Sequence, residues 1–143
     1  MRAIDLAAEA AERAAERAPA DAGEWERVGR LRLRLMDRPG AISALEHARR
    51  LGPSAEGLLD LALAYHLAGD LGGEVTATEQ ATLLEPDSPT AWSRHAHALA
   101  RTDRVTDALA ATERAERLAP GNAEVAELLA RLRAAVPRVL PAA

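Results

Sequence analysis

The chain has 143 residues, and its 22 acidic and 18 basic side chains give a formal charge of -4, which argues against nucleic acid as the main partner because phosphate binding needs a net basic face. Cysteine is absent, which excludes disulfides, thiol catalysis and thiolate metal sites, and no apolar run reaches the ~20 residues of a membrane span. Because the N-terminus also lacks the apolar core of a signal peptide, we expect a cytoplasmic protein without membrane contact.

Four prolines recur along the chain at spacings of 34, 33 and 34 residues, and a helix-capping residue follows each within two positions. The prolines are Pro19, Pro53, Pro86 and Pro120, and the capping residues are Asp21, Ser54, Ser88 and Asn122. Proline ends a helix because it donates no backbone hydrogen bond, and the capping side chain accepts the free N–H groups of the next helix. Such a period is typical of a repeat array, in which each unit buries its apolar face against its neighbours.

The segments between the prolines have apolar residues at helical spacing, which predicts eight helices or fewer in antiparallel pairs. In the first copy we expect a break at Arg38-Pro39-Gly40, and in the second a turn at Gly69-Asp70-Leu71. The alternation from Arg30 to Leu35 is by itself typical of a strand. The helical spacing of Trp25 and Val28 before it favours a helix there instead.

Several markers recur together at the same offset in each copy. The large residue is Trp25 and Trp92, the small residue is Gly29, Ala62 and Ala96, and the inner alanine is Ala48, Ala81 and Ala115. This pattern resembles the tetratricopeptide repeat family, in which the same kinds of residue mark the two helices of each repeat. Two positions depart from the family pattern: Arg32 stands where the family has an aromatic residue, and Glu74 where it has alanine.

The resemblance implies an all-α fold, a right-handed α-solenoid of helical hairpins, in a single domain that spans residues 1–136. Residues 2–18 are then a half repeat, the second helix of a copy that lacks its first. Three full repeats cover residues 22–53, 55–86 and 89–120, a capping helix covers 123–136, and residues 137–143 form a flexible tail.

In this family the first helices of successive pairs line a concave groove that holds a peptide, so the resemblance places binding residues on the outward positions of those helices. The residues that we expect to bind are Arg30, Arg34, Leu59, Leu63, His66, Leu67, Arg94, His97 and Arg101. The three leucines among them lie at four-residue spacing and form an apolar stripe. We interpret the stripe as the centre of a groove that binds a peptide with apolar anchors and acidic flanks. The alternative is that one or two of the leucines pack on the adjacent first helix.

The best-known subclass of the family holds a ligand's terminal carboxylate with lysines, asparagines and an arginine. The matching positions of this chain are Glu26, Arg30, Asp60, Thr90 and Arg94, so that only Arg94 agrees. The two acids would repel a carboxylate. We therefore predict a peptide class other than chaperone C-termini.

The histidines do not predict a metal site. His95 and His97 are two positions apart and point to different faces of a helix, whereas two imidazoles that share a metal lie three or four apart. His66 and His97 could approach each other across the groove, but no third ligand is obvious. No nucleophile with a base and no glycine-rich phosphate loop is present either. We predict no cofactor, no metal and no catalytic residue, and therefore no enzyme. The resemblance instead implies an adaptor or scaffold for protein interactions.

Two other functions stay open. The missing first helix would leave an apolar edge at the N-terminus, which favours a self-associating structural module. The apolar tail, residues 137–143, offers a second route to a homo-oligomer if it occupies the groove of another copy. The chain could also be the docking or regulatory domain of a larger enzyme or transcription regulator.

Overall fold

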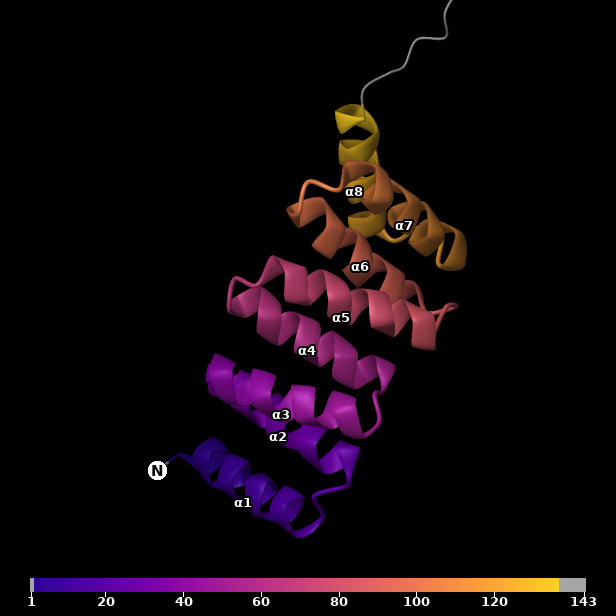
Figure 1. Ribbon diagram of the computed structural model, residues 1–143. Helices are drawn as coiled ribbons and strands as arrows, with labels where there is room; N and C mark the ends of the chain where they lie inside the picture. Colours follow the sequence, from indigo (N-terminus) through magenta and orange to yellow (C-terminus); the bar gives the residue numbers. More distant parts are fainter. Residues whose placement is uncertain (1, 137–143) are drawn as a thin grey trace, which may run out of the picture.

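The structure, a computed structural model, describes residues 2–136 and contains eight α-helices and no strand within them. The helices are α1 (Ala3–Arg17), α2 (Ala22–Arg34), α3 (Arg38–Leu51), α4 (Ala55–Leu67), α5 (Leu71–Leu84), α6 (Pro89–Arg101), α7 (Val105–Leu118) and α8 (Ala123–Ala135). They stack one after another into an elongated array (Figure 1). The strand-like alternation near Arg30 lies inside α2, as expected. The tail at 137–143 lies outside the described residues, and so does the hypothesis that it fills the groove of another copy.

The proline period predicts the starts of the first helices correctly. Asp21, Ser54, Ser88 and Asn122 are the N-cap residues of α2, α4, α6 and α8. Each side chain accepts a backbone N–H from the first turn, as where Ser54 Oγ accepts the amide of Gly57 at 2.9 Å. The caps satisfy donors that would otherwise lack a partner, so each hairpin begins at a defined residue.

The turns inside the three hairpins share one geometry. The residue at the tip has a positive φ in each: 60° at Met36, 79° at Gly69 and 58° at Asp103. The amide of the following residue bonds back into the helix, as from Asp37 to the carbonyl of Arg32 at 2.9 Å. This pattern closes the helix C-terminus. Only the second repeat has glycine, the residue that adopts this conformation without strain.

The break predicted at Arg38-Pro39-Gly40 is wrong by three residues. These residues form the first turn of α3, and the connection runs from Leu35 to Asp37. Asp37 is the N-cap and accepts the amide of Gly40 at 3.0 Å. Proline is tolerated in a first turn because its missing N–H has no helical partner there. The proline therefore helps to start the helix.

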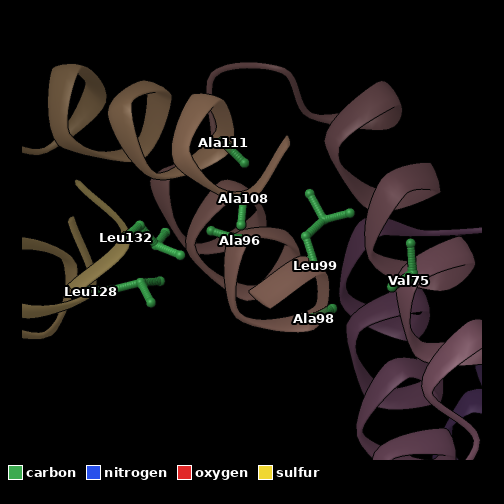
Figure 2. Packing of buried hydrophobic residues seen from close by; sticks show 8 residues of the cluster. All are labelled: Val75, Ala96, Ala98, Leu99, Ala108, Ala111, Leu128 and Leu132. Atoms are coloured by element: carbon green, nitrogen blue, oxygen red, sulfur yellow. The ribbon is translucent and has the colours of Figure 1, made fainter. Parts of the chain in front are cut away.

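Small residues let the helices pack closely. The inner alanines Ala48, Ala81 and Ala115 are at most 1% exposed. At Gly29, an added Cβ would lie 2.3 Å from Leu45 Cγ, so α2 and α3 need glycine to approach as they do. The C-terminal end of the array is closed by α8, whose Leu128 and Leu132 join the apolar cluster of α5, α6 and α7 (Figure 2).

Arg32, which replaces the expected aromatic residue, packs through a charge pair. Its guanidinium donates to Glu12 of α1, with Nε 2.9 Å from the carboxylate. At the same position of the second repeat, the hydroxyl of Tyr65 donates to Glu46 at 2.6 Å. A half-buried polar link to the preceding second helix thus forms at this position in both repeats.

The two sets of helices occupy different sides of the array. The first helices α2, α4, α6 and α8 approach one another in sequence, whereas no two of α1, α3, α5 and α7 do so within residues 2–136. The first helices therefore line the inner side of the curve. None of the eight helices has the length and apolar character that crossing a membrane requires.

Candidate functional site

Three hollows follow one another along the inner side. They lie between α2 and α4, between α4 and α6, and between α6 and α8, with volumes of about 400, 320 and 280 Å³. Leu63 lines the first and the second, and Arg94 and Glu124 line the second and the third. Because neighbouring hollows share residues, they form one continuous depression, which we call the inner groove.

The structure gathers most of the predicted binding residues in this groove. Six of them line the central hollow, namely Leu59, Leu63, His66, Arg94, His97 and Arg101. Arg30 and Arg34 line the hollow between α2 and α4, with Leu63 at its border. Leu67 lines none of the three and packs instead against the apolar cluster around Leu33 and Leu45.

The leucine stripe divides into packing and surface positions. Leu59 packs beside the cluster of Leu58, Ala81 and Ala91. Leu59 and Leu67 therefore both fit the alternative in which a leucine of the stripe packs on an adjacent first helix. Leu63 differs because it is 38% exposed and borders two hollows. The apolar centre of the groove is therefore Leu63, with the edge of Leu59 beside it.

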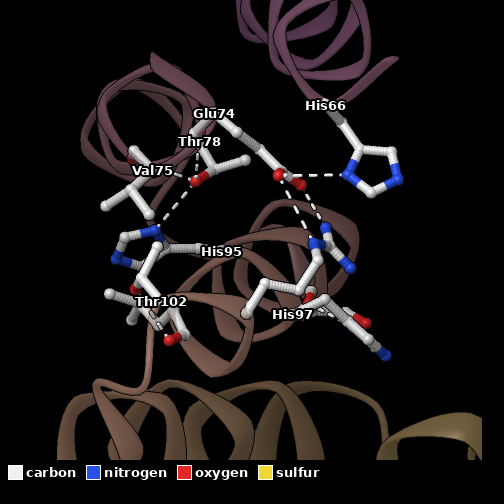
Figure 3. Close-up of polar contacts among 10 residues, drawn as sticks. His66, Glu74, Val75, Thr78, His95, His97 and Thr102 are labelled. Atoms are coloured by element: carbon white, nitrogen blue, oxygen red, sulfur yellow. Dashed lines mark hydrogen bonds and ion pairs between the residues drawn. The ribbon is translucent and has the colours of Figure 1, made fainter. Parts of the chain in front are cut away.

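A buried carboxylate lines the central hollow, and Figure 3 shows its contact with His66. Glu74 of α5 is 4% exposed and pairs with two groove residues. Arg101 donates to both of its oxygens, from Nε at 3.3 Å and from a terminal nitrogen. His66 Nδ1 lies 3.2 Å from Oε2. A carboxylate at this pairing distance balances the charge of Arg101 and fixes the direction of the guanidinium.

The two groove histidines present the same ring nitrogen. A carboxylate only accepts hydrogen bonds, so His66 Nδ1 carries a proton that it donates to Glu74. His97 Nδ1 lies 2.8 Å from the carbonyl oxygen of Ser93 and must donate as well. In the neutral form of each ring, Nε2 is then left as the acceptor. His95 lies on another face of α6, as the spacing predicts, and no group of three metal-ligating side chains occurs within the described residues.

The arginine at the other end of the groove is also paired. Arg30 lies 3.1 Å from Asp60, 3.5 Å from Glu56 and 3.8 Å from Glu26. The contact with Asp60 is an ion pair without hydrogen-bond geometry. Asp60 Oδ2 is therefore buried without a hydrogen-bond partner. Burial raises the pKa of Asp60 to about 6, against the lowering effect of Arg30. Three carboxylates here share one guanidinium.

Arg94 is the arginine of the central hollow whose guanidinium is not paired with a carboxylate of the described residues. It is exposed, and no carboxylate of the described residues lies within ion-pair distance of it. With Leu63 beside it, the central hollow offers an apolar contact, a free guanidinium and two imidazoles.

Sequence reasoning missed the part that Glu74 plays. The residue stood out only as a departure from the alanine of the resembled family, and its partners come from α4 and α6, at separations of 8 and 27 residues. The glutamate in place of alanine was the signal in the sequence that could have revealed this pairing. An acidic residue at a helix position that packs inward needs a cation, and the groove arginines were the nearest candidates.

No protein-family model matches the chain, and no curated protein matches it either. Many solved structures do. MamA superposes with a TM-score of 0.86 at 17% identity, covering 92% of this chain and 78% of that one. YrrB, described as a tetratricopeptide repeat protein with an unusual peptide-binding site, gives 0.82 at 16% identity, covering 92% and 69%.

A third similar structure contains a peptide. The first such domain of Spaghetti (RPAP3), bound to the HSP90 peptide SRMEEVD, has a TM-score of 0.74 at 20% identity and covers 80% of this chain and 91% of that one. These likenesses show that the chain has the tetratricopeptide repeat fold. The expected solenoid of helical hairpins, with three full repeats, an N-terminal half repeat and a C-terminal capping helix, is confirmed.

Proposed function

We propose that the chain is a protein-interaction adaptor that binds a peptide segment of a partner protein in the inner groove. The observation that carries the proposal is the central hollow, where six residues from two different repeats meet in one depression of about 320 Å³. Structures with the same fold include a domain bound to a peptide and a protein described as having an unusual peptide-binding site. They support a peptide as the kind of ligand.

The peptide that fits this groove has an apolar side chain with an acidic group nearby. Leu63 is the exposed apolar contact, and burying a leucine-sized side chain against it contributes about 1.5–3 kcal/mol. Arg94 supplies the unpaired guanidinium for the acidic group, and the Nε2 atoms of His66 and His97 accept hydrogen bonds from the peptide backbone. Arg101 contributes shape and donors more than net charge, because Glu74 balances it.

Selection from a displayed peptide library against the intact protein tests the proposal. Selected peptides should contain a large apolar residue and an acidic residue, and their Kd should be measured by calorimetry. Arg94→Glu and Leu63→Asp should each weaken binding at least tenfold. Both residues are exposed, so these changes leave the fold intact.

Arg38→Glu is the matched control for charge reversal. Arg38 is exposed in the first turn of α3, away from the inner groove, and an acidic residue suits a helix N-terminus. Its Kd should equal that of the unaltered protein. Equal Kd values for all four proteins would refute the groove as the binding site.

A further inference from the structure

A further hollow lies away from the inner groove. We call it the outer hollow, and it is bordered by residues of α5, α6 and α7. A related hollow exists one repeat earlier, among α3, α4 and α5. Each of the eight residues that line the earlier hollow has its counterpart, 33 or 34 positions later, among the residues that line the outer hollow. The two are therefore the same site in successive repeats.

The two copies of this site differ in size. The earlier hollow has a volume of about 200 Å³, and the outer hollow has about 460 Å³. The ring of Tyr65 lines the earlier one, and its counterpart in the outer hollow is the shorter Leu99. Thr82 likewise replaces the long side chain of Arg49. At the position of Leu99, the third repeat thus lacks the aromatic ring that Tyr65 supplies in the second repeat.

The polar partner of the missing ring is still in place. Glu46 accepts the hydroxyl proton of Tyr65 at 2.6 Å, and the counterpart of Glu46 in the outer hollow is Glu79. Glu79 is exposed, and no hydrogen bond or ion pair within the described residues engages its carboxylate. An acceptor for a hydroxyl group therefore stands where the second repeat has one.

The walls of the outer hollow suit an aromatic ring. Leu83, at 75% exposed, borders it together with Trp92. His95 is buried, and its Nδ1 lies 2.9 Å from Thr78 Oγ1 (Figure 3). Thr78 directs its own hydroxyl proton to a backbone carbonyl of α5, so His95 Nδ1 is the donor and Nε2 an acceptor. Burial lowers the pKa of His95, which keeps the ring neutral.

We propose that the outer hollow binds a tyrosine side chain of a partner protein. The phenol ring takes the place that the Tyr65 ring takes one repeat earlier, and its hydroxyl donates to Glu79 as Tyr65 donates to Glu46. This site is independent of the inner groove. It would let the chain hold two partner segments at once.

Titration of the protein with p-cresol, a small-molecule analogue of the tyrosine side chain, tests this site by nuclear magnetic resonance. Saturable shifts should appear at Leu83, Ala110 and the His95 ring, and 4-methylanisole, which has no hydroxyl donor, should bind at least fivefold more weakly. Glu79→Ala should remove that difference between the two compounds, because it removes the acceptor. Absence of saturable shifts at these residues would overturn the proposal.

Leu99→Tyr is the matched variant, because it restores the residue of the second repeat. It should weaken p-cresol binding at least tenfold, since its own ring then fills the hollow. If circular dichroism shows that this variant does not fold, Ala110→Leu serves the same purpose, because Ala110 is exposed at the mouth of the hollow. Unchanged p-cresol affinity in the folded variant would also overturn the proposal.

Discussion

Glu74 and Arg101 pair across the interface between the second and third repeats, 27 residues apart in the chain. The Glu74 side chain is 5% exposed and the Arg101 side chain 37%, so the pair joins a buried anion to a cation at the groove surface. Loss of one partner from such a pair is costly, because the other charge stays desolvated. Arg101 is therefore a structural residue as well as a groove residue, which changes how its mutants must be interpreted.

Arg101→Glu should destabilise the fold by about 3 kcal/mol, because it places a second carboxylate beside the buried Glu74. Arg94→Glu should change the free energy of unfolding by less than about 0.5 kcal/mol, because the side chain is exposed and unpaired within the described residues. Urea denaturation of both variants measures the difference. Equal stability of the two would contradict the structural part that Arg101 plays.

Glu74→Ala should strengthen binding of an acidic peptide, since Arg101 then keeps its full charge in the groove. At an effective dielectric of about 40–80, as at a solvent-exposed groove surface, one unpaired charge about 4 Å from a carboxylate changes the binding free energy by about 1–2 kcal/mol, or about fivefold to thirtyfold in Kd. Calorimetry at low and high salt should show that the gain shrinks as salt rises. A Kd that is unchanged or weaker at low salt would indicate that Arg101 does not contact the peptide.

Local signals in the sequence predicted most of the fold. Proline, the capping residues and helical spacing act within a few positions of one another, so Ser54 or Asn122 could be identified as a cap without knowledge of the rest. The pairing of Glu74 with Arg101 depends on how two repeats stack, and so does the burial of Asp60. Side-chain spacing along one helix carries no information on such contacts. The predicted arginines do line the hollows of the groove, whereas their carboxylate partners were not identified from the sequence.

Asp60→Asn should stabilise the protein above pH 6 and leave it unchanged near pH 4. Burial raises the folded-state pKa of Asp60 from 3.8 to about 6, so between these values the folded chain holds a proton that the unfolded chain has lost. Unfolding then becomes easier as pH rises through this window, and the cost stays constant above it. The asparagine variant has no such cost and should gain about 1–3 kcal/mol at pH 7. Thermal unfolding of both proteins from pH 4 to 8 tests this, and a constant difference across that range would contradict it.

Met36→Gly should stabilise the protein although it deletes a large side chain. Met36 has φ 60° at the tip of the first hairpin, where the second repeat has Gly69, and its side chain is 55% exposed. The left-handed conformation costs a residue with a Cβ about 1–2 kcal/mol, and the greater freedom of glycine in the unfolded chain offsets part of the relief. A net gain of about 0.5–1 kcal/mol remains. Asp103→Gly at the third tip should gain less, because aspartate tolerates this conformation better than methionine. A lower denaturation midpoint for Met36→Gly would show that the contacts of the methionine side chain stabilise the fold by more than its left-handed backbone conformation costs.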